Sequence, residues 1–221
     1  MNRKVRLSEV DRERIRLAVE RAEEKTSGEI VPVVLDSAAS YERATWIWTA
    51  LGGLLGAVLF VTWHEWRLYR NWNAEELLQS PVWALLSQII GLFAGYFLSG
   101  FSGLKRRVLP RLHLARSVDA RAKELFVEYG LTRTRDRTGV LLLVSRFERR
   151  VEILADEGIH RVVGEGYWKA QVDDLVQAIH QDRFIEGLER CIASIGARLA
   201  EKFPRAADDQ NELSNEPREG V

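Results

Sequence analysis

The sequence has 221 residues, enough for one modest domain and some additional structure, and 32 basic residues balance 32 acidic residues. A net charge of zero argues against a general nucleic-acid-binding protein. The one cysteine, Cys191, excludes an internal disulfide and a metal cluster built from cysteines. It lies in an apolar helical stretch, where a buried small hydrophobic residue is expected.

The N-terminal segment predicts a helix followed by a strand. Ser8 is a suitable N-cap with Asp11 at the capping-box distance, and apolar residues then follow at helical spacing until Gly28. The run from Glu29 to Leu35 is rich in β-branched residues and predicts a strand. Pro32 within it favours an edge strand or a bulge, because proline has no N–H group to donate to a sheet. The basic start of the chain has no apolar run behind it, so we expect no cleavable signal peptide.

Two apolar runs without any Asp, Glu, Lys or Arg follow, at residues 44–63 and about 81–101. Each has the length of a helix that crosses a bilayer, about 20 residues. Six of the seven tryptophans lie in or beside these runs, as amphipathic rings do at the depth of lipid head groups. The two runs and the polar loop between them therefore predict a transmembrane hairpin.

Small residues recur at a spacing of four within both runs, at Gly52 and Gly56 and at Gly91 and Gly95. Such stripes allow helix backbones to approach closely in lipid. We expect them to pack the two helices of the hairpin together, with self-association of the protein as the alternative.

Basic residues flank the hairpin unevenly, and they predict its orientation. The outer flanks carry five, and the connecting loop carries two, Arg67 and Arg70. This distribution predicts a two-pass protein of the inner or plasma membrane with both termini and the soluble domain in the cytoplasm. The basic side chains after the second run also suit anionic lipid head groups or an acidic partner, although they are equally consistent with ordinary solvated helix faces. The five flanking residues are Arg43, Lys105, Arg106, Arg107 and Arg111.

The chain after the hairpin predicts further helices and two strands. An amphipathic helix is expected from Ser117 to Tyr129, and an entirely apolar run at 139–145 predicts a strand buried on both faces. The alternating residues at 150–155 suit its antiparallel partner across a tight turn. Helices are expected near 159–163, 166–179 and 184–202. The segment from Pro204 onward has no apolar periodicity and predicts a disordered acidic tail.

Two stretches of the sequence, LSEVDRERIRLAVERAEEKTSGEIVPVV and LFVEYGLTRTRDRTGVLLLVSRFERRVEILADEGI, resemble the TPM domain family. The resemblance covers residues 7–41 and 115–202. It implies an α/β/α sandwich with a small mixed sheet, interrupted here by the transmembrane hairpin. The predicted parts of the chain are then 1–43 and 104–203 for the domain, 44–103 for the hairpin and 204–221 for the tail.

The resemblance also implies binding of a divalent cation such as Ca²⁺, or a weak acid phosphatase activity. Relatives commonly carry an Asp-Asn pair directly before the second strand, whereas this chain has Arg137 and Thr138 there, with Asp136 one position earlier. Hard cations bind carboxylate oxygens, so the candidate ligands are residues at predicted strand ends. These are Asp36, Asp136, Glu148, Asp156 and Glu157, and we expect the three aspartates to be the ligands if a cation binds.

No motif for a catalytic nucleophile or a phosphate-binding loop is present in the sequence. We therefore expect a membrane-anchored binding or assembly module without catalytic activity. Its expected partners are anionic lipids and another membrane or membrane-associated protein. The alternative is a divalent-cation-dependent phosphatase of low activity that uses the three aspartates.

Overall fold

The structure is a computed structural model that describes residues 7–70, 80–205, 208 and 211–220. The chain divides into two compact units, one formed mainly by Ser40–Arg111 and the other by Lys4–Ala39 together with Leu112–Val221. The second unit is therefore assembled from two separate stretches of sequence, with the first unit inserted between them.

The second unit contains a four-stranded mixed sheet with the order β3-β2-β1-β4. Strand β1 (Glu29–Leu35) runs parallel to β2 (Gly139–Ser145), and β2 runs antiparallel to β3 (Arg150–Ala155). Strand β4 (Arg218–Gly220) pairs in parallel with the end of β1. All seven residues of both β1 and β2 are buried.

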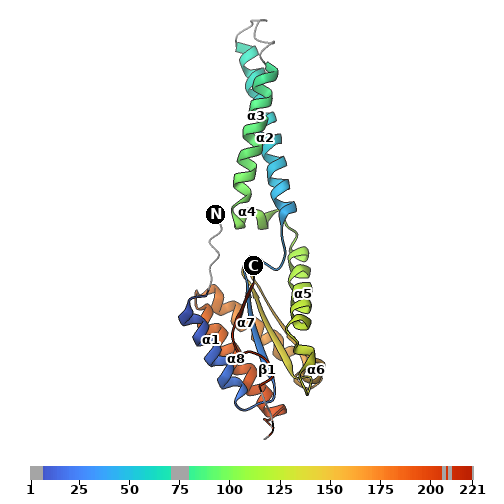
Figure 1. The fold of residues 1–221 in the computed structure, drawn as a ribbon. Coiled ribbons are helices and arrows are strands. Elements are labelled where there is room, and N and C mark those ends of the chain that lie inside the picture. The colour runs from blue at the N-terminus through green and yellow to red at the C-terminus, as the bar shows by residue number, and fades with distance from the viewer. Residues whose placement is uncertain (1–6, 71–79, 206–207, 209–210, 221) are drawn as a thin grey trace. The chain divides into compact units, whose positions relative to one another are not determined.

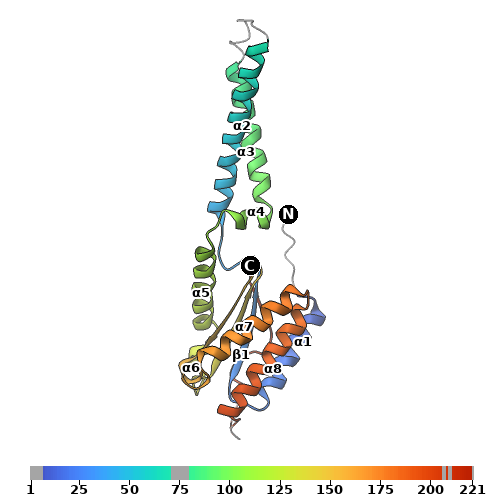
Figure 2. The same ribbon diagram turned by 180° about the vertical axis from the view of Figure 1, so that it is seen from behind.

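Helices cover both faces of this sheet (Figures 1 and 2). One face packs against α1 (Glu9–Glu23), α6 (Glu157–Val163), α7 (Glu165–His180) and α8 (Phe184–Lys202). The other packs against α5 (Arg111–Glu128) and the short 3₁₀ helix η2 (Leu131–Arg133). This arrangement confirms the predicted α/β fold with a small mixed sheet.

Alternation along the central strands divides the core between the two faces. In β2, Leu142 faces the side of α1 and α8, whereas Leu141 and Leu143 face α5, and all three are fully buried. Full burial of a leucine side chain contributes about 1.5–3 kcal/mol, so each of these three residues favours folding substantially. At the start of the chain, Ser8 caps α1 as predicted, because its Oγ accepts a hydrogen bond from the backbone N–H of Asp11 at 3.1 Å.

Strand β1 lies between β2 and β4 in the order of the sheet, yet Pro32 itself occupies an edge position, as expected. The reason is that β4 covers only the last part of β1, from Val33 to Leu35. Pro32 lies just before this paired stretch, where its missing N–H group has no strand partner to lose.

The C-terminal segment also differs from the disordered acidic tail expected from Pro204 onward. Pro204 forms an isolated bridge with Thr26, and Arg218–Gly220 form β4. Glu219 pairs with Arg12 on α1 at 2.9 Å, and Leu213 packs against the core on the α5 face. These contacts join residues some 200 positions apart in the sequence, so no local pattern could indicate them. Residues 206–207, 209–210 and 221 of the expected tail lie outside the described residues.

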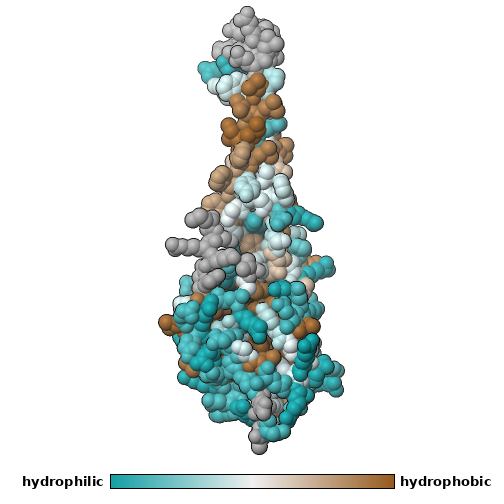
Figure 3. Space-filling model, viewed as in Figure 1, coloured by the Kyte–Doolittle hydropathy of each residue, from teal (hydrophilic) through white to brown (hydrophobic). Residues whose placement is uncertain are grey.

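The inserted unit consists of α2 (Glu42–Arg70), α3 (Ser80–Ser99) and the short α4 (Ser102–Arg107). Helix α2 continues through part of the expected loop as far as Arg70, and residues 71–79 lie outside the described residues. By length and composition, Glu42–Arg67 and Pro81–Ser99 could each cross a membrane, and only 11% of each apolar window is buried. Hydrophobic surface accordingly covers these two helices in Figure 3.

Candidate functional site

The register of the sheet separates Asp36 from the other two candidate aspartates, Asp136 and Asp156. Glu29 pairs with Gly139 and Leu35 with Ser145, so β1 and β2 begin at the same end of the sheet. Asp136 precedes β2, and Asp156 follows the antiparallel β3, which places both at this end. Asp36 follows β1 and lies at the opposite end, about 20 Å away for a seven-residue strand at about 3.3 Å per residue. Within the described part of the chain, no group of three or more His, Cys, Asp or Glu side chains could hold a metal ion.

Asp156 is buried and its carboxylate is fully engaged. It is the N-cap of α6, and its Oδ1 accepts a hydrogen bond from the backbone N–H of Glu157 at 2.7 Å. The guanidinium of Arg137 donates to both carboxylate oxygens, at 3.0 and 3.1 Å. This bidentate pair raises the pKa of Arg137 above its ordinary value. A cation could bind Asp156 only by displacing the arginine that occupies the position of the relatives' Asp-Asn pair.

The other two aspartates, Asp136 and Asp36, are more exposed to solvent than Asp156. The Asp136 carboxylate is half exposed and lies 3.9 Å from the guanidinium of Arg135. The Asp36 carboxylate lies 4.0 Å from the guanidinium of Arg146, which is the first residue after β2. Each aspartate therefore lies beside an arginine, an arrangement that opposes the binding of a second cation.

A buried glutamate organises the end of the sheet where Asp36 lies. Glu148 accepts hydrogen bonds from the backbone N–H of Ala38 at 3.0 Å and from the hydroxyl groups of Ser37 and Ser145. It thereby joins the turn between β2 and β3 to the segment that leaves β1. The sequence analysis named Glu148 as a possible cation ligand, whereas in the structure its carboxylate is engaged by these three donors. Its role in the structure is to hold two loops together.

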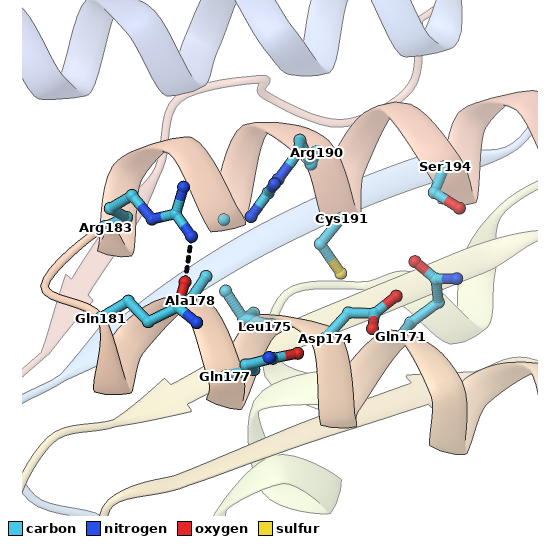
Figure 4. Close-up of a pocket in the computed structure, with 11 residues that line it drawn as sticks. Gln171, Asp174, Leu175, Gln177, Ala178, Gln181, Arg183, Arg190, Cys191 and Ser194 are labelled. Atoms are coloured by element: carbon cyan, nitrogen blue, oxygen red, sulfur yellow. Dashed lines mark hydrogen bonds between the residues drawn. The ribbon is translucent and has the colours of Figure 1, made fainter.

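A groove between α7 and α8 has a volume of about 390 Å³ (Figure 4). Its lining is polar, and Gln171 and Asp174 from α7 face Cys191 and Ser194 from α8. Cys191 is buried, as expected, and burial together with the charge of Asp174 raises the pKa of its thiol to about 12. Because the thiolate is the reactive form, this cysteine is not a nucleophile at neutral pH.

The glycines predicted to pack helices lie at the contact between α2 and α3. A Cβ atom on Gly52 would collide with the carbonyl oxygen of Gly91, and one on Gly95 would collide with that of Trp48. The backbones of α2 and α3 are therefore in direct contact along this stripe. Helix α4 also contacts α2, because Trp48 Nε1 donates a hydrogen bond to the carbonyl oxygen of Leu104 at 3.0 Å. Gly56 approaches the carbonyl oxygen of Ser87 in the same way.

Three of the predicted basic flanking residues, Lys105, Arg106 and Arg107, form the last turn of α4, and Arg111 begins α5. Cations in the last turn of a helix also interact favourably with the negative end of its dipole. The structure therefore places a dense positive charge directly after the apolar helix α3.

Comparison with known proteins gives two findings. The model of the family described as TPM domain matches residues 108–198, which contain the whole of α5, η2, β2, β3, α6 and α7 and most of α8. Among solved structures, the chain is similar to the NMR structure of BA42 protein from the psychrophilic bacterium Bizionia argentinensis. The identity is 20%, the TM-score is 0.59, and the likeness covers 100% of both chains. At this identity the likeness concerns the fold alone, and no curated protein matches the chain.

Proposed function

We propose that this chain, which carries a TPM domain, is a membrane-anchored binding module without catalytic activity. The observation that carries the proposal is the exposed apolar surface of α2 and α3. Leu54 on α2 is 62% exposed, and Ile90 and Phe97 on α3 are 68% and 74% exposed. In all, 22 large apolar side chains on the two helices are exposed, with exposed fractions of 37–91%.

Such a surface is unfavourable in water. Soluble monomers rarely expose a continuous apolar patch of more than a few hundred Å². The contact between α2 and α3 uses the glycine stripe and leaves the large side chains directed outward. A core helix of a soluble protein would bury these side chains, and only 11% of either apolar window is buried. The hydrocarbon interior of a bilayer is the environment that suits both the length and the exposed faces of the helices.

The basic residues of α4 support a position at an anionic surface. Lys105, Arg106 and Arg107 follow α3 directly, and each contributes about 1 kcal/mol of attraction near anionic lipids. The same residues, with Arg43 and Arg111, favour a cytoplasmic location of the TPM domain and of both termini. A fluorescent protein fused after Val221 should then mature, whereas alkaline phosphatase at the same position should stay inactive. The reverse pair of results would refute this orientation.

The state of the aspartates favours a non-catalytic role over a cation-dependent phosphatase. Asp156 is occupied by Arg137, and Asp36 lies a full strand away from Asp136. Metal-assisted hydrolysis requires carboxylates that converge on one ion. The domain therefore has the structural features of a scaffold that presents surfaces to a partner.

The proposal can be tested on membranes from cells that express the full chain. We expect the protein to remain in the pellet after alkaline carbonate extraction and to require detergent for release. Leu54→Arg combined with Leu55→Arg should release it, because each arginine at a helix centre costs about 2.5–3.5 kcal/mol. Tyr69→Arg, near the exposed end of α2, is the matched control and should leave the protein in the pellet.

Activity is tested on the detergent-purified chain with a phosphate ester, in the presence and absence of Ca²⁺ and Mg²⁺. We expect no turnover and no saturable heat of cation binding. Turnover that Asp136→Ala abolishes would overturn the non-catalytic role. A protein that stays in solution without detergent would overturn the membrane anchor.

A further inference from the structure

A groove of about 550 Å³ runs between α1 and α8 at the surface of the second unit. The two helices run in the same direction, because Arg14 pairs with Glu189 and, further along, Ala22 lies against Gly196. Every residue that lines the groove belongs to this unit, so its shape does not depend on the position of α2 and α3.

The floor of the groove consists of small side chains. Ala18 and Ala22 form it on α1. A Cβ atom added to Gly196 would lie 2.6 Å from the Cβ atom of Ala22, so the two helices almost touch at the base of the groove. These small residues leave an apolar trough that the larger apolar side chains of another molecule could fill. On α8 the trough is lined by Ala193, Gly196, Ala197 and Ala200.

The charged residues at the edges of the groove leave an excess of positive charge. Four cations and two carboxylates line it, and the Arg14 guanidinium donates to both carboxylate oxygens of Glu189, at 2.7 and 2.9 Å. Three cations therefore remain beside one carboxylate, that of Glu186. The three cations are Arg21, Lys25 and Arg190.

Two of these cations, Arg21 and Lys25, stand together on the edge formed by α1. Both are exposed, and neither forms an ion pair within the ranges that the structure describes. They lie four residues apart on one helix, a spacing at which like charges repel each other. Beyond the pair of Arg14 with Glu189, the other residues that line this half of the groove are alanines and one glycine. External carboxylates would therefore neutralise the two cations and relieve their repulsion.

We propose that this groove binds an acidic amphipathic helix of a partner protein. The apolar face of that helix covers the alanine floor, and its carboxylates lie beside Arg21 and Lys25. From Arg14 to Lys25 the groove is about 17 Å long at about 1.5 Å per residue, which suits a helix of about three turns. This inference deepens the proposed binding role and rests on it, because it names the surface and the class of partner.

The geometry favours this occupant over others. An extended peptide needs an unpaired strand edge for its backbone, and two helices offer none, whereas a helix satisfies its own backbone groups. A second copy of the groove would bring a concave surface and more cations. A free phosphate ion would leave the alanine floor uncovered. The acidic C-terminal segment of this chain is already engaged elsewhere, since Glu219 pairs with Arg12 and Arg218–Gly220 form β4.

The test places the photo-crosslinking residue p-benzoylphenylalanine at position 186 of the full chain, which is expressed and irradiated in the cells of its source. Glu186 lines the groove, and its loss removes a carboxylate that would oppose an acidic ligand. We expect an adduct with a different protein, whose crosslinked peptide forms a helix with carboxylates along one side and apolar residues along another. The same crosslinker in place of Val127, which is 60% exposed and follows the opposite face of the sheet on α5, is the matched control and should not form this adduct.

Charge variants test whether the cations hold the partner helix. Arg21→Glu with Lys25→Glu should lower the adduct yield about fivefold or more, because two attractions become repulsions. Arg21→Lys with Lys25→Arg keeps both charges and should give the wild-type yield. Arg133→Glu with Lys169→Glu reverses two exposed cations outside the groove and should also leave the yield unchanged. Lysines in place of the carboxylates of the crosslinked peptide should restore the adduct of the first variant.

Three results would overturn the inference. These are adducts with lipid or a second copy only, or none at all; a crosslinked segment that is not acidic; and a yield that charge reversal leaves unchanged or that the compensating lysines do not restore. Circular dichroism of each purified variant verifies that the fold is retained. The crosslinking requires neither carbonate extraction nor an activity assay. A chain that carbonate releases, or that hydrolyses the phosphate ester, could still form the adduct, so a failure of the proposed function and a failure of the groove can be told apart.

Discussion

Replacement of Glu23 by glutamine should make the α/β unit more stable at alkaline pH. Glu23 is the last residue of α1, and its Oε1 accepts a hydrogen bond from the backbone N–H of Ile30 at 2.8 Å. Burial, and to a smaller extent the neighbouring charge of Glu29, raise the pKa of Glu23 to about 8. The hydrogen bond from Ile30 acts in the opposite direction and only partly offsets the burial.

The sign of the effect follows from proton binding. Between pH 4.5 and about 8 the folded domain keeps the proton of Glu23, whereas the unfolded chain loses it. The folded state therefore binds more protons, and stability falls as the pH rises through this range. A difference of about 3.5 pKa units, at about 1.36 kcal/mol each, corresponds to a loss of up to about 5 kcal/mol. Relaxation of the loop around a charged Glu23 would reduce this loss.

Glu23→Gln cannot ionise, and its side-chain oxygen can still accept the hydrogen bond from Ile30. The variant should match the wild type within about 1 kcal/mol at pH 5 and exceed its free energy of unfolding by about 2–5 kcal/mol at pH 9. Glu24→Gln, the exposed neighbour, is the matched control and should show no such difference.

The measurement is denaturant-dependent hydrogen exchange of the full chain in detergent, followed by mass spectrometry of peptides from β1 and β2. These strands are buried in the α/β unit, so their exchange reports its unfolding without interference from α2 and α3. Parallel stability curves for wild type and Glu23→Gln from pH 5 to 9 would refute the reasoning.

Three other predictions concern packing, the buried ion pair and the thiol. Gly91→Leu should weaken the contact of α2 with α3 by about 1–3 kcal/mol in detergent, which would lower the midpoint of thermal unfolding. The control Gly103→Ala should leave the midpoint unchanged, because no atom lies within 4 Å of the added methyl group. Equal midpoints for the two variants would contradict the close packing. Arg137→Gln should lower the midpoint of urea unfolding, because it leaves the Asp156 carboxylate buried without its cation, and an unchanged midpoint would show that the pair contributes nothing. Cys191 should react with a maleimide at pH 7 only after unfolding, since its thiol is buried with a pKa of about 12, and rapid labelling of the native chain would contradict this.

Local patterns in the sequence determined much of the architecture. The hydrogen bond from the backbone of Asp11 to the side chain of Ser8 requires residues only three positions apart, so the start of α1 could be predicted. The strand at 139–145 was recognisable because burial on both faces requires an unbroken apolar run. Uncharged apolar runs of bilayer length likewise indicated the helices α2 and α3.

The tertiary structure alone decided which residues meet. Whether Asp36 joins Asp136 depends on the direction in which β1 pairs with β2, and parallel pairing places them at opposite ends. The acidic C-terminal segment becomes β4 because the end of β1 offers unpaired backbone groups and α1 offers Arg12. Strand pairing and ion pairs between distant residues depend on where the whole chain brings their partners, and that information is absent from any short stretch of sequence.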